Sequence, residues 1–334
     1  LIYLLGASPA VCASFLAGNR NHPLIPFDTG SNSLYLPNAT SLRMGDLGYT
    51  SNAQSGLNVC YNNLDNYLAT LSNAIITPHP DYAQFDVTET GEQAQLNDSL
   101  LQIENEFYSP IRPKRVAQSG EAPIVALKRG GIEYIEIRCI DINPFLPLGI
   151  DAETMRLIDV FLVDAILSES PLCNEDGQRR NQENLRRVVN EGRATNLQLL
   201  TPEGEKPLEA VARQLLNSMS KTAHTMDAEA GSNLHQQAVA TAYARIADPE
   251  STPSGRVLQE MRETNTPFWQ LALNYSKQWH KDFLTNPLSP IEMAEFRTAT
   301  AASLNQQQAM EKDTQESFKT YLSRFYSQYE RVDD

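Results

Sequence analysis

The clearest hydrophobic pattern in the chain is an alternation of apolar and polar residues between Gly130 and Asp141, which reads GGIEYIEIRCID. Successive side chains of a β-strand point to opposite faces, so Ile135, Ile137 and Cys139 share one face. The other face carries Tyr134, Glu136, Arg138 and Ile140. The pattern predicts a strand over 132–140 that places a carboxylate and a guanidinium on the same face.

A second alternating run, over 101–107, lies upstream and also gathers its carboxylates on one face. Alternation of this kind is typical of a half-buried strand. We predict that 101–107 and 132–140 are strands of one sheet. Glu104, Glu136 and Arg138 are then expected on the same concave face.

Helical spacing of apolar residues dominates the second half of the chain and recurs once in the first half. Asp151 is the expected N-cap of one helix, and Ser289 with Glu292 forms a capping box at the start of another. The expected helices are 62–76, 151–166, 207–226, one from Ser232 to just before Pro249, one from Pro267 and one from Ser289.

The two halves therefore differ in character. Residues 1 to about 150 hold most of the glycines and the strand-like runs, whereas 151–334 is rich in Ala, Glu, Gln and Leu. We expect an α+β fold with a sheet region that carries the chemistry over 1–150. A mostly helical region over 151–334 packs on and beside that sheet. Its end carries a helically spaced stripe, typical of a docking face, of Phe318, Tyr321, Leu322, Phe325 and Tyr329.

The charge balance of the chain excludes several classes of partner. The net charge is −14, from 27 Lys and Arg against 41 Asp and Glu, so nucleic acid and acidic membrane surfaces are repelled. No apolar run reaches the ~18–20 residues needed to span a bilayer. The four cysteines are far apart in sequence and form no CxxC pair, which is typical of reduced cytosolic thiols.

The chemistry of the strand-like runs has two interpretations. A compact basic cluster, Ile111-Arg112-Pro113-Lys114-Arg115, follows the carboxylates of 101–107. Carboxylates that share a cavity are hard oxygen ligands for Mg²⁺, and Arg or Lys beside them suits phosphate oxygens. This combination is what phosphoryl transfer requires. The alternative is a strand with one wet face whose charges are simply solvated.

A second motif, Ala39 to Tyr49, reads ATSLRMGDLGY. It can be a loop that offers Arg43 as a fork for a carboxylate and Tyr49 as a pocket wall. It can equally be a surface turn broken by its two glycines, and spacing alone slightly favours the turn.

Four blocks that occur in one order give the chain a family resemblance. Together they resemble bacterial glutamate–cysteine ligase of the γ-proteobacterial type, also called γ-glutamylcysteine synthetase. The resemblance is dense to about residue 165 and thins beyond that to scattered identities such as Asn190–Arg193. The four blocks are Leu5–Ala10, Ala39–Thr50, Leu101–Arg115 and Gly130–Phe145.

The resemblance implies the fold of the glutamine synthetase catalytic domain, an open, mostly antiparallel sheet curled into a funnel with helices outside. It also implies the first step of glutathione synthesis. ATP phosphorylates the γ-carboxylate of glutamate, and the amine of cysteine attacks the acyl phosphate to give γ-glutamylcysteine, ADP and phosphate. The implied cofactor is Mg²⁺, with Mn²⁺ as a substitute. The implied enzyme is cytoplasmic and, at full length, a monomer, with glutamate, cysteine and ATP as its small-molecule partners.

The resemblance carries roles over to individual residues. Glu136 would bind Mg²⁺, with Glu104 as a further ligand, and Arg138 would contact the transferring phosphate. Arg43 would pair with a substrate carboxylate. The Tyr134 face of the strand would point into the funnel and the opposite face would pack against the helices.

The remaining assignments concern cysteine and the nucleotide. By the resemblance, Tyr49 and Tyr108 help to form the cysteine pocket. From the basic cluster we add Arg112, Lys114 and Arg115 as ligands of the nucleotide phosphates.

The sequence departs from the family at its beginning. The family has further metal-binding carboxylates and a His on strands that would precede Leu1, so the chain resembles the last two-thirds of the enzyme. We expect these strands to be missing here and the 334 residues alone to be inactive. The alternative is a non-catalytic remnant that binds nucleotide or a partner, and the DNA upstream of Leu1 would distinguish the two.

Overall fold

The computed structural model describes residues 1–16, 22–28, 30, 32–48, 52–54, 56–85, 94–313 and 316–329. The chain forms two compact units. Unit 1 comprises Leu1–Tyr67, Phe107–Pro113 and Ile135–Tyr275, and unit 2 comprises Leu68–Glu106, Lys114–Tyr134 and Ser276–Asp334. Because the units interleave along the chain, they do not coincide with the consecutive regions 1–150 and 151–334, and that boundary stays a prediction.

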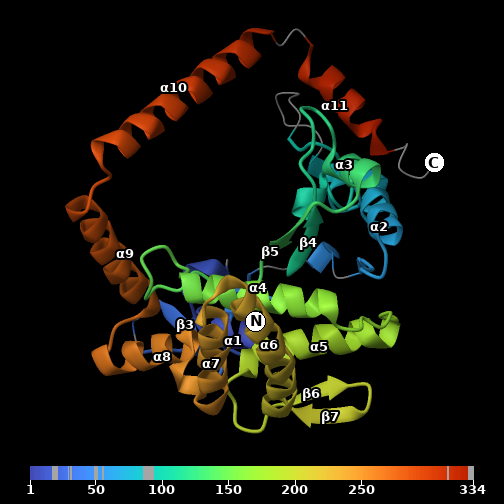
Figure 1. Cartoon of the computed structure of the whole chain (residues 1–334). Helices are drawn as coiled ribbons and strands as arrows, with labels where there is room; N and C mark the ends of the chain where they lie inside the picture. Colours follow the sequence, from blue (N-terminus) through green and yellow to red (C-terminus); the bar gives the residue numbers. More distant parts are fainter. Residues whose placement is uncertain are drawn as a thin grey trace. The chain divides into compact units, whose positions relative to one another are not determined.

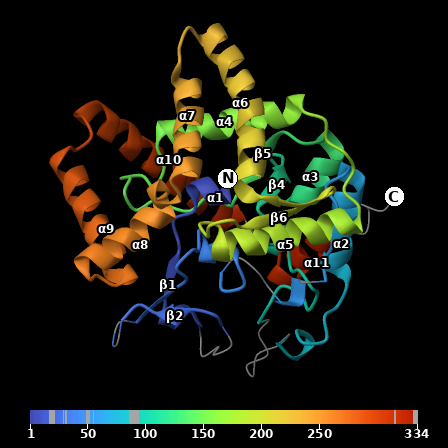
Figure 2. The same cartoon turned by 90° about the horizontal axis from the view of Figure 1, so that it is seen from below.

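Unit 1 is built around a helical core. Helices α6 and α7 lie side by side and α4 packs against both (Figures 1 and 2). Short α1 enters the same core through Leu4 and Leu5, which meet Val160 of α4 and Met219 of α6. The helices of this unit are α1 (Ile2–Leu5), α4 (Ala152–Leu167), α5 (Glu175–Glu191), α6 (Leu208–Ala230), α7 (Leu234–Ala247), α8 (Pro253–Thr264) and the first part of α9 (Phe268–Thr285).

The start signals read from the sequence are confirmed. The carboxylate of Asp151 accepts a hydrogen bond from the Thr154 amide at 2.8 Å and caps α4. In unit 2, Ser289 and Glu292 form the reciprocal pair of a capping box, at 2.8 and 3.3 Å, and Pro290 begins α10 (Pro290–Asp313).

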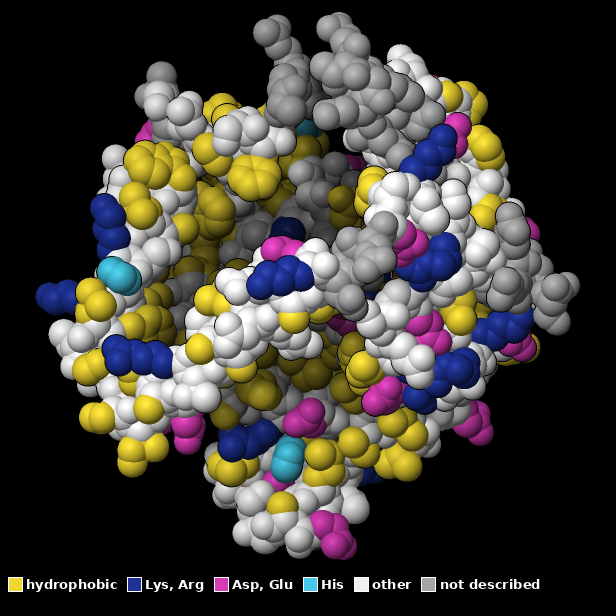
Figure 3. All heavy atoms as spheres, turned by 90° about the horizontal axis from the view of Figure 1, so that it is seen from above, with side chains coloured by type: hydrophobic (Ala, Val, Ile, Leu, Met, Phe, Trp, Pro, Cys, Tyr) yellow, Lys and Arg dark blue, Asp and Glu magenta, His cyan; other side chains and the backbone are white. Residues whose placement is uncertain are grey.

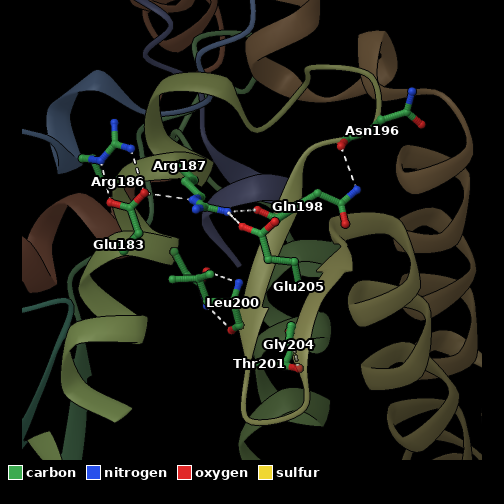
Figure 4. A network of polar contacts seen from close by, with 10 residues as sticks. Glu183, Arg186, Arg187, Asn196, Gln198, Leu200, Thr201, Gly204 and Glu205 are labelled. Carbon is green, nitrogen blue, oxygen red and sulfur yellow. Dashed lines mark hydrogen bonds and ion pairs between the residues drawn. The ribbon is translucent and has the colours of Figure 1, made fainter. Parts of the chain in front are cut away.

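Three small sheets accompany the helices. The first has the strand order β1-β3-β2, and both of its pairs are antiparallel. The second pairs β4 with β5, and the third is the antiparallel hairpin β6–β7, which lies against α5 (Figure 4). The strands are β1 (Ala10–Cys12), β2 (Ile25–Pro26), β3 (Ser33–Tyr35), β4 (Ile111–Lys114), β5 (Tyr134–Ile137), β6 (Gln198–Thr201) and β7 (Gly204–Pro207).

The strand predicted over 101–107 is wrong. Residues Glu104–Glu106 form the 3₁₀ turn η5, and the partner of β5 is β4. Local side-chain bonds explain the difference, because the Glu106 carboxylate accepts from the Gln102 amide at 2.7 Å. Bonds of this kind satisfy the backbone within the segment and compete with a strand ladder. Glu104 therefore does not share a sheet face with Glu136 and Arg138.

The strand predicted over 132–140 is confirmed only in its middle, as β5. Ile137 and Cys139 pack with Met44 and Val189, as expected for the face that meets the helices. Ile135, expected on that face, is instead 45% exposed. Ile140, expected on the other face, joins the same apolar cluster. The ladder of β5 ends at Ile137, so strand alternation does not govern the residues after it.

Unit 2 contains most of α2 (Leu64–Ile76), α3 (Pro123–Gly130), the end of α9, α10 and α11 (Phe318–Tyr326). Within Pro290–Asp313, all described side chains except Met293 are exposed. Helix α10 is therefore held by its own backbone bonds and its cap. Exposed apolar side chains lie among charged ones over the face drawn in Figure 3. None of the described helices is long and apolar enough to cross a membrane.

The terminal helix α11 and the residues after it dock within unit 2, on residues 102–104 and 120–122. The Tyr329 hydroxyl donates to Glu104 at 2.7 Å, and the Tyr326 hydroxyl donates to the Gln102 carbonyl at 2.9 Å. Leu322 and Tyr329 are buried, so the predicted docking face is confirmed for these two residues, whereas Phe318 is 58% exposed.

Replacing Tyr329 by Phe tests how much this docking contributes to unit 2. The substitution keeps the ring but leaves the buried Glu104 carboxylate without one of its donors, so we expect the free energy of unfolding to fall by about 1–3 kcal/mol. Urea unfolding measures the change. Tyr321→Phe is the matched control, because Tyr321 lies in α11, just before Tyr329, and its ring stacks on Phe325. Equal changes in the two variants would contradict the prediction.

Candidate functional site

A buried carboxylate, Asp141, joins three separate stretches of unit 1. Its Oδ2 accepts from the Ala7 amide at 2.8 Å and from the Ser8 hydroxyl at 2.7 Å. Its Oδ1 accepts from Nε of Arg43 at 2.7 Å, and the Asp141 side chain is only 3% exposed. Three of the four sequence blocks that carry the family resemblance therefore meet at one residue.

Arg43 lies in the 3₁₀ turn η2 (Leu42–Met44) and contacts the segment that follows β5. Besides its ion pair with Asp141, its Nη2 donates to the carbonyls of Arg138 and Ile140, at 2.9 and 3.0 Å. The edge of the guanidinium formed by Nε and Nη2 is thus occupied by hydrogen bonds to other residues of the protein. A substrate carboxylate could take this edge only if these bonds broke, and the substrate role of Arg43 stays a prediction.

Arg138 lies close enough to Arg43 for their charges to interact. Burial, and then the positive charge of Arg43, lower the pKa of Arg138. A guanidinium is cationic at neutral pH. On the other side, Nε of Arg138 is 3.8 Å from Oε1 of Glu136. An anion that met both guanidiniums would relieve their repulsion, so this group of side chains suits a phosphoryl or carboxylate group.

Glu136 and Glu104 are in different surroundings. The Glu136 side chain beside Arg138 is 39% exposed and so is partly accessible from solvent, although its Oε2 is buried. Glu104 is buried, and its two oxygens accept from the Ile124 amide at 2.8 Å and from the Tyr329 hydroxyl at 2.7 Å. These contacts indicate that Glu104 stabilises the fold, and they do not favour it as a metal ligand.

A complete metal site does not form among the residues that the structure describes. No three side chains of His, Cys, Asp or Glu come together there as a possible ligand set. Glu136 offers a partly exposed carboxylate beside Arg138. The assignment of Glu136 and Glu104 to a metal stays a prediction.

The residues assigned to the cysteine pocket are only partly described. Tyr49 lies outside the described residues. Tyr108 is 42% exposed, and its amide donates to the side-chain oxygen of Gln54 at 3.0 Å. Gln54 thus links the segment after Tyr49 to the residues before β4.

Two of the three residues assigned to nucleotide phosphates donate hydrogen bonds to backbone carbonyls of the protein itself. Arg112 is buried and donates to the Phe107 carbonyl. Arg115 donates to the carbonyls of Gly130 and Gly131 and closes the end of α3, where a Cβ on Gly130 would lie 2.6 Å from the guanidinium.

Lys114 differs from these two arginines. Its ammonium donates to the amide oxygen of Asn105, a neutral acceptor, at 3.1 Å. All three assignments stay predictions.

The sequence patterns missed Asp141, which they treated as the end of a strand. Its binding partners are 98 and 134 residues away in sequence, so no periodicity could reveal them. The only signal was an acidic residue directly after an apolar run, Cys139-Ile140-Asp141.

Comparison with known proteins places these residues in a family. Residues 1–188 match the family model described as glutamate–cysteine ligase. The chain is 45% identical over 325 residues to glutamate–cysteine ligase of Pseudomonas paraeruginosa, which covers 97% of this chain and 61% of that protein. It is 44% identical over 325 residues to the enzyme of Pseudomonas aeruginosa, with the same coverage of 97% and 61%.

A solved structure agrees with these matches. The chain is similar to glutamate–cysteine ligase of Francisella tularensis in complex with AMP, with a TM-score of 0.92 and 30% identity over 99% of this chain and 65% of that chain. This likeness confirms the predicted fold class. The chain spans 61% of the length of the two Pseudomonas relatives. The chain belongs to the glutamate–cysteine ligase family.

Proposed function

We propose that these residues form part of the active site of an ATP-dependent glutamate–cysteine ligase. The observation that carries the proposal is the pair of neighbouring guanidiniums: Arg43 is held by Asp141, and Arg138 lies next to the Glu136 carboxylate. All four residues lie within the stretch that matches the family model. The chain spans 61% of its relatives' length, so the proposed activity is that of a polypeptide with the relatives' full length.

The proposed reaction explains why two cations are needed at one place. A carboxylate resists attack by an amine, so the γ-carboxylate of glutamate first takes the γ-phosphoryl group of ATP, and ADP leaves. The amine of cysteine then attacks the acyl phosphate, and phosphate leaves as the amide forms. Negative charge stays on the transferring group throughout, and fixed cations stabilise it. Arg138 is proposed to contact this group, and Arg43 to hold a substrate carboxylate beside it.

Nucleotide binding is supported by a relative. The similar ligase of Francisella tularensis was solved in complex with AMP. For this chain we propose that Lys114 contacts a nucleotide phosphate, and that Tyr108 and Tyr49 border the space for cysteine. The enzyme is proposed to act in the cytoplasm, where its three substrates are available.

Glu136 is proposed to bind Mg²⁺, or Mn²⁺ in its place. Mg²⁺ is usually held by one or two carboxylates together with phosphate oxygens and water, so a single accessible carboxylate is a useful contribution. When bound, the ion would neutralise charge on the phosphates of ATP. Further ligands would come from the nucleotide, from water and from groups outside the described residues.

An assay of phosphate release tests the proposed function. It compares the 334-residue chain with a polypeptide of the relatives' full length. In the longer polypeptide we expect phosphate release that needs ATP, glutamate and cysteine together, with γ-glutamylcysteine identified by mass spectrometry. We expect the 334-residue chain alone to be inactive. Release without either amino acid, or none in the longer polypeptide, would refute the proposal.

Glu136→Gln tests the metal role in the longer polypeptide. Gln keeps the shape of the side chain but removes the charge that attracts Mg²⁺, so we expect turnover to fall by about 10²-fold or more while the fold is kept. Circular dichroism checks the fold, and activity is titrated against Mg²⁺. Unchanged activity at low Mg²⁺ would exclude the ligand role.

Arg138→Lys and Arg43→Lys separate the two arginines. Lys keeps the charge but loses the planar fork, so Arg138→Lys should mainly lower kcat if Arg138 meets the transferring phosphate. Arg43→Lys should mainly raise KM for an amino-acid substrate if Arg43 holds a substrate carboxylate in ground and transition states alike. Steady-state kinetics with each substrate varied gives both constants, and the reverse pattern would exchange the two roles.

A further inference from the structure

Arg193, which follows α5, is a buried arginine that binds a whole loop. Its side chain is 0% exposed. Its Nε donates to the Ala39 carbonyl at 3.3 Å, its Nη2 to the Pro37 carbonyl at 2.5 Å, and its backbone amide to the Asn38 carbonyl at 3.0 Å. Nη1 pairs with Glu250 at 2.5 Å. One residue therefore satisfies three consecutive carbonyl groups.

The last turn of α5 holds the next residue of the same loop. The Thr40 amide donates to the Val189 carbonyl at 2.9 Å, and the Thr40 hydroxyl donates to the Val188 carbonyl at 2.8 Å. The approach is close, since a Cβ on Gly192 would lie 2.6 Å from the Thr40 methyl group. Residues 37–40 are thus fixed at every position by the end of α5 and Arg193.

This fixed loop leads directly into η2, which carries Arg43. The Leu42 amide donates to the Ser8 carbonyl at 2.7 Å, and Met44 packs against Val189 of α5. Arg43 then reaches Asp141 at 2.7 Å. A shift of 37–40 would move the start of η2 and with it the guanidinium of Arg43.

The burial of Arg193 is not explained by stability. Burial is costly for a guanidinium, and replacing a buried ion pair by apolar groups is often neutral or stabilising. The Glu250 side chain is 52% exposed, so it could be hydrated without its partner. What Arg193 provides is a set of directed bonds, and a planar group with five donors can satisfy several carbonyls at fixed positions in a way that an ammonium cannot.

We propose that Arg193 is a positioning residue that sets the place of Arg43 through the loop 37–40. The inference rests on the proposed function, in which Arg43 holds a substrate carboxylate. Arg193 lies in Asn190–Arg193, a stretch that the resemblance included only as a scattered identity. It does not touch the proposed reacting groups in this arrangement, and its effect passes through the backbone of the loop.

Arg187 of α5 is a matched control six residues before Arg193 in the sequence. Its Nε pairs with Glu183 at 2.9 Å, and its Nη1 donates to the Gln198 carbonyl and to Glu205, both at 2.8 Å (Figure 4). Like Arg193, it links a helix to a carbonyl and to carboxylates. The segment that it holds is the hairpin β6–β7 and not the loop before Arg43.

The experiment compares Arg193→Lys with Arg187→Lys in the polypeptide of the relatives' length, each with Arg43 intact and in an Arg43→Ala background. We expect Arg193→Lys to raise KM for the amino acid that Arg43 binds by about tenfold or more, since small displacements of a binding group are costly. Arg187→Lys should leave this KM within about twofold. In the Arg43→Ala background, Arg193→Lys should have little further effect on KM, because the residue through which it acts is gone.

Hydrogen exchange provides a readout that does not depend on activity. We expect the amides of Thr40 and Leu42 to exchange faster in Arg193→Lys and to keep their rates in Arg187→Lys. If Arg193→Lys does not fold, Glu250→Gln replaces it, with a smaller change in the same direction, because Gln keeps a hydrogen bond to Arg193 but removes the charge.

The outcomes separate the two proposals. Equal KM values for Arg193→Lys and Arg187→Lys, or an undiminished effect of Arg193→Lys in the Arg43→Ala background, would overturn the inference while ligase activity stands. Absence of activity in the unsubstituted polypeptide would instead refute the proposed function. The exchange rates at Thr40 and Leu42 would then still decide whether Arg193 positions the loop.

Discussion

The ion pair between Asp141 and Arg43 is the contact on which the arrangement of the site depends. Asp141 is almost fully buried, and a buried carboxylate is tolerated only when its charge is balanced and its oxygens accept hydrogen bonds. Arg43 supplies the charge, and Ala7 and Ser8 supply the bonds. Removing one partner of a buried ion pair typically costs about 3–5 kcal/mol. The chain segments around Ala7, Arg43 and Asp141 are therefore locked to one another as a set.

This lock gives the neighbouring cations a fixed geometry. Arg43 binds the carbonyls of Arg138 and Ile140, so the backbone that carries Arg138 cannot move independently of Arg43. Two guanidiniums that repel each other would otherwise separate in the absence of an anion. The protein keeps the two side chains near one another, which would lower the reorganisation needed if a charged group binds there as proposed. The buried contacts of Arg193 extend the same constraint to the far side of the loop.

The sequence could predict those features that depend on interactions between residues close together in the chain. The cap at Asp151, the capping box at Ser289 and the centre of the strand at 134–137 depend on neighbours within a few residues, and their patterns were sufficient. The run 101–107 also alternates, but its bonds close locally between Gln102 and Glu106, and alternation does not distinguish this case from a strand.

The candidate site was less accessible to pattern reading. Residue spacing alone could not decide whether Arg43 lies in a surface turn or in a loop that binds a carboxylate. Only the family resemblance assigned Arg43 and Arg138 to the same site. The link through Asp141 spans 98 residues, and the tasks of Arg115 and Glu104 depend on distant backbone and hydroxyl groups that no periodicity encodes. Sequence patterns thus predicted local elements. The family resemblance identified candidate site residues, which only long-range contacts bring together in the fold.

The docking of α11 also has a consequence for how the protein is made. Glu104 receives its bond from Tyr329, which lies 225 residues later in the chain. At a synthesis rate of ~5–20 residues per second, this interval lasts about 10–45 s. The residues of this chain that belong to unit 1 end at Tyr275, and the last helix of unit 2 is made after them. During that interval the acceptor on Glu104 and the surface that α11 covers face water, so the order of emergence makes unit 2 the later to fold and the part that most needs protection during synthesis.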